Sequence, residues 1–423
     1  MGKAGFKTIG VLLCAASILL AGLTRSYAEE PVSLNALVDE ALKSNPQIRA
    51  AEYRYEAAKA RVTLLRTLED PRIEYEYDNI TADMEAVMNN KTGPMRTFAV
   101  SQEVPFPTKL ILRRQSAQKE ANAFQQEYRE VEQKVIREVK EAFFRLFISG
   151  KKIAVTKENL DLLSQFIEIA NKKYSVGKAK EQDVLRAQVE YSKLSNQLVL
   201  LEQEEKIATS LLNSLLDRPE DKAVGALEER KDVALELDAD KVVRLTKENR
   251  PELKSFQEMV EKSKIDYSLA KQEYLPDLMF KYKREEKDGR PGAWAGMVGM
   301  TIPLWFWEKQ NSFVKEAKAN LEQAKADYKA TQNMVLFESR SAYAKFEAAR
   351  KLVKIYETGV LPQAQSALDT ARLGYEADKI DFLDFLDSHR TLREFQIEYF
   401  ESLANLEIAL ADLERSVGAD LSK

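Results

Sequence analysis

The sequence of 423 residues contains very little cysteine, histidine, glycine and proline. Its one cysteine is Cys14 and its one histidine is His389, so disulfide frameworks and metal sites built from several of these residues are excluded. We also find no glycine-rich phosphate loop and no nucleophile elbow. The carboxylates, although abundant, are spread among basic residues. We therefore expect neither an enzyme nor a bound cofactor or metal.

The scarcity of turn-forming residues also bears on the fold. Only 15 glycines and 12 prolines occur, which favours long helices and few turns. Charged residues make up 31% of the chain, but the net charge is only −4 because both signs are interspersed. No basic block suggests a nucleic-acid partner, and the mixed pattern is typical of solvated helix faces.

Long apolar runs are missing everywhere except near the N-terminus. Lys3 and Lys7 precede an apolar stretch over residues 9–23, which ends in the small-x-small pattern of Ser26-Tyr27-Ala28. This pattern predicts a secretory signal peptide over residues 1–28, with cleavage after Ala28. The rest of the chain has no run near the ~18 apolar residues that a membrane helix needs. If it enters a membrane, it must do so as strands.

Lipidation at Cys14 is the alternative interpretation of this segment. A lipoprotein signal has a small residue before its cysteine, but here that residue is Leu13. Use of Cys14 would also cut the apolar stretch in half. We therefore expect cleavage after Ala28.

The sequence contains one domain-sized unit twice. Asn45-Pro46 and Arg250-Pro251 open two similar stretches, and Pro71 and Pro276 close them, in both cases with a shift of 205 residues. Further along, Tyr174 precedes Asp183-Val184-Leu185 as Tyr375 precedes Asp384-Phe385-Leu386, with a shift of 201. A period this long indicates a duplication rather than a solenoid. We predict repeats over residues 29–219 and 241–423, joined by a connector over residues 220–240 near the waist.

Each repeat contains two short stretches with strand periodicity, within about residues 71–106 and 276–304. Ile73, Tyr75 and Tyr77 alternate with charged residues in the first repeat. In the second repeat Leu278, Phe280 and Tyr282 alternate with Met279, Lys281 and Lys283. The segments are about ten residues long, with one apolar face and one polar or small face. Both features are typical of membrane β-strands.

Four strands are too few to close a barrel, and hydrocarbon does not tolerate unpaired sheet edges. We therefore expect self-association, and three copies would supply twelve strands facing outer-membrane lipid.

The remaining sequence predicts helices of matched length. The expected helices span residues 34–68, 107–174, 180–216, 241–274, 306–375 and 381–416. The longest would extend about 100 Å at 1.5 Å per residue. Gly359 and Pro362 should bend or break the segment 306–375. The fold class is thus mainly α with a membrane β-barrel, built from a duplicated helix–hairpin–helix–helix unit.

These features resemble the outer-membrane efflux protein family (TolC-like) over about residues 34–418. The resemblance is carried by the Asn-Pro and Arg-Pro repeat starts, the strand exit from Gln102 to Pro107, the two turns after Tyr174 and Tyr375, and the stretch Leu212–Pro219. It implies a trimeric twelve-stranded barrel over an α-helical barrel. It also implies docking of a periplasmic adaptor protein and an inner-membrane pump at the periplasmic mouth. The stretch from Gln102 to Lys109 is most similar to the heavy-metal efflux branch.

The resemblance places the pore and periplasmic gate at the turns about 174–183 and 375–384. Its acidic constriction residues correspond to Asp183, Asp384 and Asp387, and its gate tyrosine to Tyr375, with Tyr174 at the equivalent turn. Ile380 stands where the family often has a basic latching residue, which puts a salt-linked closed gate in doubt.

Each assignment has a simpler alternative. Asp183 and Asp384 are also placed to cap helix N-termini, whereas Asp387 has no such role. His389 is expected to be a packed or solvent-facing residue. For the whole chain, a periplasmic coiled-coil adaptor or scaffold is the alternative function, although it would leave the two hairpins unexplained.

Overall fold

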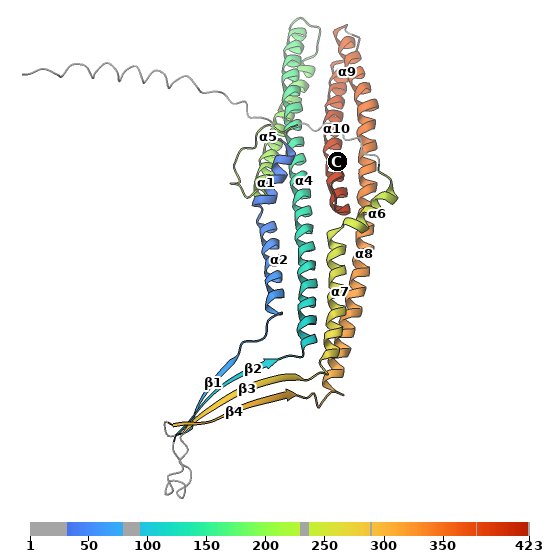
Figure 1. Ribbon diagram of the computed structural model, residues 1–423. Helices are drawn as coiled ribbons and strands as arrows, with labels where there is room; N and C mark the ends of the chain where they lie inside the picture. The colour runs from blue at the N-terminus through green and yellow to red at the C-terminus, as the bar shows by residue number, and fades with distance from the viewer. Residues whose placement is uncertain (1–31, 79–93, 229–236, 288–289, 378, 422–423) are drawn as a thin grey trace, which may run out of the picture.

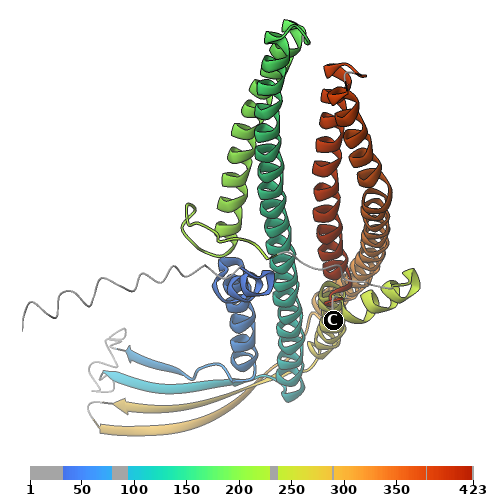
Figure 2. The same ribbon diagram turned by 90° about the horizontal axis from the view of Figure 1, so that it is seen from above.

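A computed structural model describes residues 32–78, 94–228, 237–287, 290–377 and 379–421. The predicted signal peptide, with Cys14 and the cleavage point after Ala28, lies outside these residues. A four-stranded sheet lies at one end of a long rod of helices (Figure 1). The second view shows the strands extending sideways from the foot of the rod (Figure 2).

The sheet is antiparallel, in the order β1-β2-β3-β4. β1 spans Arg72–Asp78, β2 Met95–Val104, β3 Asp277–Lys287 and β4 Arg290–Thr301. These bounds confirm the four predicted strands. The centre of the sheet joins the two repeats, because β2 of the first pairs with β3 of the second along ten residues from Met95↔Lys287 to Val104↔Leu278.

The two faces of the sheet differ in chemistry. Cross-strand neighbours on one face include Ile73, Val100 and Tyr282 in one row, then Tyr75, Phe98 and Trp294 in the next. Several of these side chains are strongly exposed, with Trp294 at 72%. The opposite face is polar or small, and there Lys281 Nζ lies 2.6 Å from Glu74 Oε2. The alternation predicted from the sequence is therefore present.

Ten helical elements complete the described chain. Their bounds are α1 Leu34–Ser44, α2 Pro46–Leu64, α4 Pro107–Ser175, α5 Glu181–Leu215, α6 Ala239–Asn249, α7 Pro251–Gln272, α8 Lys309–Ile355, the π-helical turn η1 Tyr356–Val360, α9 Leu361–Glu376 and α10 Phe382–Val417. The single helix α4 contains 69 residues and runs the length of the rod (Figure 1). On the other side of the rod, α7 and α10 follow one another along the long helix of the second repeat.

Two predicted helices are each split in the structure. The helix expected over residues 34–68 breaks at Asn45, because Pro46 cannot donate a backbone hydrogen bond. Its second part ends at Leu64. The Asn45 side chain caps the new helix by accepting from Gln47 N at 2.8 Å. The helix expected over residues 241–274 breaks in the same way before Pro251.

These two breaks receive the C-termini of α5 and α10. Asn45 Nδ2 donates to Leu215 O at 2.9 Å, and the Arg250 guanidinium donates to Arg415 O. Just beyond these carbonyls, Asp217 (φ 55°) and Gly418 (φ 77°) adopt the left-handed conformation that ends many helices. The Asn-Pro and Arg-Pro motifs are thus the places where the last helix of each repeat docks.

The core is divided along the rod. One cluster, around Val135, Phe143 and Leu212, packs the first repeat at the waist. A second, around Phe346 and Leu413, does so for the second repeat. A third cluster joins α4 and α5 to α9 and α10 near the far end of the rod, so the two helix pairs are in contact close to their turns.

The long segment of the second repeat is continuous, with one irregular turn. In η1 the Leu361 N–H bonds to Tyr356 O, five residues back. The cause is Pro362, which has no N–H for the carbonyl four residues earlier and whose ring would clash with it in a regular helix. The irregularity predicted at Gly359 and Pro362 is therefore a π turn rather than a break.

Candidate functional site at the helical tips

The turn between α4 and α5 is closed by backbone hydrogen bonds. Gly177 N donates to Tyr174 O at 2.9 Å and Lys178 N to Lys173 O at 2.8 Å. Gly177 has a φ of 73°, which a side chain would disfavour. The turn between α9 and α10 has equivalent bonds, including Lys379 N to Gly374 O at 2.8 Å. Both turns project at the far end of the rod from the sheet (Figure 1).

Three of the five predicted site residues are exposed at these tips. Tyr174 is 46% exposed and closes the first turn. Asp384 and Asp387 are exposed on the first two turns of α10, three positions apart and therefore on one side of the helix. Both carboxylates are open to solvent and can therefore interact with a passing ion.

Asp183 is half-buried and has a structural role. Its Oδ2 accepts from the Lys180 backbone N–H at 3.3 Å, within the first turn of α5. An acidic side chain in this position satisfies a free donor and interacts favourably with the helix dipole. The capping alternative therefore has a contact to support it at Asp183, whereas Asp384 has none on its carboxylate that the structure records.

Tyr375 is half-buried between the two helix pairs. Its ring stacks on Phe385 with centroids 5.6 Å apart and an interplanar angle of 7°. Lys173 Nζ, at the end of α4, lies 4.1 Å from the centroid of the Tyr375 ring and 3.0 Å from its backbone oxygen. Tyr375 thus links the tip of one helix pair to the other, a contact that Tyr174 does not share.

Ile380 belongs to the same apolar cluster as Tyr375. It packs so closely against Gly374 that a Cβ added there would lie 3.3 Å from the Ile380 side chain. An apolar contact therefore occupies the position where the family often has a basic latching residue.

An ionic cluster that the sequence did not predict joins the two helix pairs below the tips. Glu190 on α5 is only 6% exposed; it pairs with Arg390 on α10 and lies 3.7 Å from Arg393. A signal for it was present, since Glu190 falls in the buried stripe between Ala187 and Leu194. A charged residue at a core position needs a partner.

His389 is packed, one of the two alternatives predicted for it. It is 4% exposed, and its ring meets that of Phe166 edge-on with centroids 5.7 Å apart. Burial, followed by repulsion from Arg393, lowers the pKa of His389 to about 4. The imidazole is therefore neutral at pH 7.

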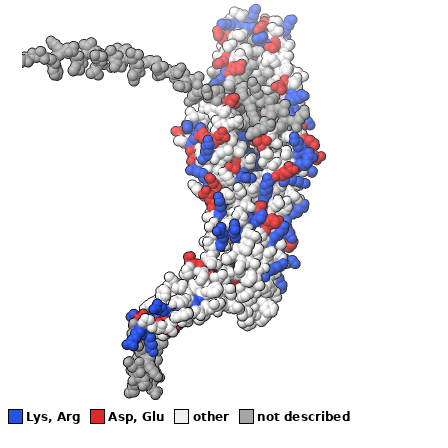
Figure 3. Space-filling model, viewed as in Figure 1, with Lys and Arg blue, Asp and Glu red and all other residues white. Residues whose placement is uncertain are grey.

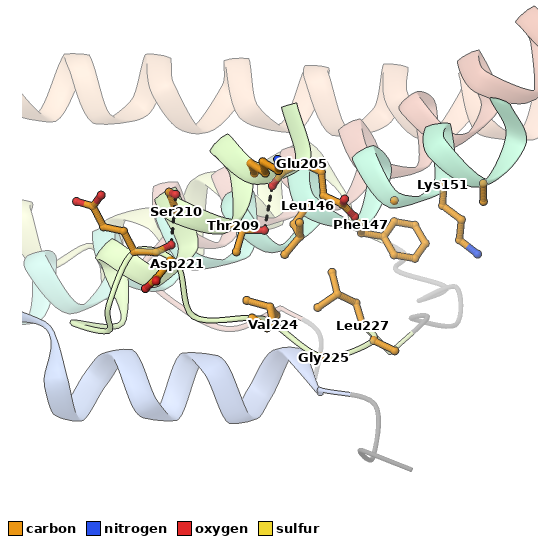
Figure 4. A pocket seen from close by; sticks show the side chains of 16 residues that line it. Leu146, Phe147, Lys151, Glu205, Thr209, Ser210, Asp221, Val224, Gly225 and Leu227 are labelled. Carbon is orange, nitrogen blue, oxygen red and sulfur yellow. Dashed lines mark hydrogen bonds between the residues drawn. The ribbon is translucent and has the colours of Figure 1, made fainter. Parts of the chain in front are cut away.

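The waist contains a hollow of about 880 Å³ between α4, α5 and residues 220–227 (Figure 4). Leu146, Val224 and Leu227 line it, and Ser210 donates to Glu220 O at 3.3 Å along its edge. Val32 pairs with Leu227 beside it in a parallel bridge. This hollow is lined by none of the five predicted residues.

Among the described residues, no three or more histidine, cysteine or carboxylate side chains are grouped so as to hold a metal ion. No helix within the described ranges is both long and apolar enough to cross a membrane.

Residues 37–217 and 242–419 match the family described as outer membrane efflux protein. The chain belongs to this family. It is thus an outer-membrane efflux channel, of the kind found in tripartite efflux systems, with a helical portion in the periplasm. The family is not enzymatic, which confirms that prediction and favours the channel over the scaffold alternative.

Known proteins resemble this chain in sequence and in fold. The cobalt-zinc-cadmium resistance protein CzcC of Cupriavidus metallidurans is 21% identical over 395 residues, covering 92% of this chain and 91% of CzcC. The outer-membrane channel OprN superposes with a TM-score of 0.79 at 18% identity, covering 92% and 91% of the two chains. CusC gives 0.77 at 16% identity and 92% of each. Channels of this fold are trimers with a β-barrel above a helical barrel, as the sequence predicted.

Proposed function

We propose that three copies of this chain join their sheets into a twelve-stranded barrel and their helices into a tube. Substrates would then pass passively from the periplasm to the exterior. The observation that carries the proposal is the four-stranded sheet with an exposed aromatic face, which ends in two edge strands, β1 and β4. Edge backbone groups in hydrocarbon need partners, and the edge of a second copy supplies them.

Exposed apolar side chains along the rod support the same assembly. On α5 they include Val199, Leu200 and Ile207, each at least 60% exposed, and on α8 Phe337 at 67%. Such large exposed side chains on long helices mark contact surfaces. They are suited to pack α5 of one copy beside a neighbouring copy.

The tips would form the periplasmic mouth. Three copies of Asp384 and Asp387 would make rings of carboxylates that favour cations. Asp183 and Tyr174 would lie at the same mouth, and Tyr375 would form part of the gate by joining the two helix pairs. Exposed side chains such as Val176, at 68%, would contact a periplasmic adaptor protein that links the channel to an inner-membrane pump. The signal peptide over residues 1–28 and the repeats 29–219 and 241–423 with their connector 220–240 complete the proposal.

Heavy-metal cations are the substrates we favour, with small toxic compounds as the alternative. The similarity to CzcC, a cobalt-zinc-cadmium resistance protein, and the exposed acidic pair Asp384 and Asp387 support this choice. The channel itself needs no metal-binding site, because a duct need not bind what it conducts.

Replacing Asp387 with alanine tests the mouth. A carboxylate ~8 Å from a passing cation in water contributes about 0.5 kcal/mol, so a ring of three favours cations by roughly tenfold before screening. In planar bilayers, we expect the cation-to-anion permeability ratio of Asp387→Ala trimers to be at least threefold lower than that of the unaltered channel. Asp327→Ala, which removes an exposed carboxylate from α8 far from the tips, is the matched control. An unchanged reversal potential in Asp387→Ala would remove this residue from the pore.

A deletion strain tests the substrate. We expect it to become more sensitive to cobalt, zinc and cadmium salts, with recovery when the intact gene is restored. Sensitivity confined to detergents or drugs would contradict heavy-metal export and leave the channel itself intact. A purified chain that is monomeric by light scattering in detergent would instead contradict the barrel.

A further inference from the structure

Two arginines lie on the apolar face of the sheet at its outer end. Arg96 on β2 and Arg284 on β3 are both exposed. Phe98 faces Arg284 across the two strands, and Arg96 faces Glu286, so all four side chains are on one side of the sheet. Diagonal neighbours on one face have Cβ atoms about 7 Å apart. Both guanidinium groups can therefore reach a single anion placed between them.

The position of this pair along the strands matches the edge of a hydrocarbon layer. Exposed apolar side chains extend along the strand from Trp294 to Ile302, and the turn that follows exposes Leu304, Trp305, Phe306 and Trp307 as well. The eight steps from Trp294 to Ile302, at about 3.4 Å each and tilted by about 40°, span roughly 21 Å, close to the ~25 Å apolar band of membrane barrels. Arg284 lies opposite Trp294, and Arg96 is one row farther out. Lysine and arginine gather at this end of the sheet (Figure 3).

Neither arginine is neutralised within the described part of the chain, where no carboxylate lies within ion-pair distance of either. The polar face is different, because there Lys281 pairs with Glu74 at 2.6 Å and Lys283 with Glu285 at 3.0 Å. On the apolar face Glu286 is the acidic residue nearest in register, opposite Arg96. The two arginines thus carry more charge than this one carboxylate offsets.

We propose that Arg96 and Arg284 bind the phosphate of a phosphorylated lipid headgroup in the outer leaflet. The planar guanidinium donates two parallel hydrogen bonds to phosphate oxygens, and it does so best near a low-dielectric surface. Tyr75, Phe98 and Trp294 lie in the same row as Arg284, next to the row of Arg96, and provide an aromatic surface for the acyl chains. The inference rests on the proposed barrel, which turns this face toward lipid.

Native mass spectrometry of the detergent-purified trimer tests the site. Dioleoyl phosphatidic acid, with an exposed phosphate, is compared with dioleoyl phosphatidylcholine at equal concentration. We expect the intact channel to retain phosphatidic acid preferentially. Loss of one charged hydrogen-bond donor costs roughly tenfold in affinity, so Arg96→Ala/Arg284→Ala should abolish the preference, and Arg96→Lys/Arg284→Lys should weaken it.

Two further variants distinguish this site from general charge. Lys281→Ala/Lys283→Ala removes the same charge from the same part of the sheet but from its polar face, and should keep the preference. Glu286→Gln should strengthen it, because it removes the opposing carboxylate. Undiminished preference in the double alanine variant, or equal loss in the lysine pair, would overturn the proposal. If the double variant does not assemble, Arg96→Gln and Arg284→Gln are compared singly, and unchanged retention in both would also overturn it. The trimer peak in the same spectra tests the barrel separately.

Discussion

At the scale of single residues, buried charge is what distinguishes this rod from a simple coiled coil. Arg250 is 1% exposed and is surrounded by Glu130 at 3.3 Å and Glu252 at 3.1 Å. Burial raises the pKa of Glu130, although Arg250 and Arg415 oppose the shift. In the first repeat the equivalent position is Asn45, which makes its contact to the last helix without charge. The two repeats therefore share a docking geometry but not its electrostatics.

The lowered pKa of His389 predicts that the stability of the protein depends on pH. Its pKa is lowered from 6.5 to about 4 in the folded protein, so between these values the unfolded chain binds a proton that the folded chain does not. Protonation of His389 therefore leaves the free energy of unfolding unaffected above pH 6.5 and lowers it as the pH drops toward 4. The shift corresponds to an upper limit of about 3 kcal/mol.

The measurement is the thermal unfolding midpoint at pH 7.5 and pH 4.5. We expect His389→Gln, which does not titrate, to reduce the drop between the two values relative to the unaltered protein. An equal drop in both proteins would show that protonation of His389 is not coupled to folding.

At the scale of elements, the sequence predicted most helices and strands to within a few residues, because long periodic segments leave little ambiguity. It failed at Asn45-Pro46 and Arg250-Pro251, where apolar periodicity continues across a proline and masks the break. The candidate site was only partly predictable. Local sequence identified the exposed carboxylates, but the Glu190–Arg390 contact joins residues 200 positions apart and depends on tertiary packing.

The ends of α5 and α10 offer a matched pair of substitutions. At Gly418 an added Cβ would lie 3.0 Å from Asn249 O and Arg250 Cα, and the φ of 77° disfavours a side chain. We expect Gly418→Ala to destabilise the protein by about 1–3 kcal/mol. Asp217→Gly, at the equivalent left-handed position, should leave stability unchanged or raise it by up to about 1 kcal/mol.

Unfolding in denaturant, followed by circular dichroism, compares the two variants with the intact protein. A destabilised Asp217→Gly together with an unaffected Gly418→Ala would contradict this account of the helix ends.

At the scale of the whole molecule, assembly follows from what one copy leaves exposed. The sheet turns Trp294, Val298 and Met300 outward at 72%, 70% and 59% exposure. A globular protein would bury such residues, but a membrane covers them. Most charged side chains of the sheet, such as Glu74, Lys281 and Lys283, lie on the opposite face, which faces the interior in the proposed barrel.

Neighbouring residues on β4 test this division. Val298 faces the apolar side and Met297 the polar side. We expect Val298→Lys to cost about 2–4 kcal/mol per copy through burial of a charge in hydrocarbon, and so to reduce insertion into lipid vesicles. Met297→Lys should insert nearly as well as the intact chain. The folded fraction is read from heat-dependent mobility on gels, and equal yields for the two variants would contradict the orientation of the sheet.

The π turn at Tyr356–Val360 also determines which residues of α9 face the core. Along α8 the inward positions follow a regular seven-residue frame through Val335, Ser339, Ala342, Phe346 and Val353. Continued unchanged, that frame would reach residues 367, 370 and 374, but the residues that pack inward on α9 are Leu368, Ala371 and Tyr375. The extra residue in the turn thus shifts the inward-facing positions of α9 by one residue, or about 100° around the helix axis. Without it, Tyr375 would be rotated away from Phe385.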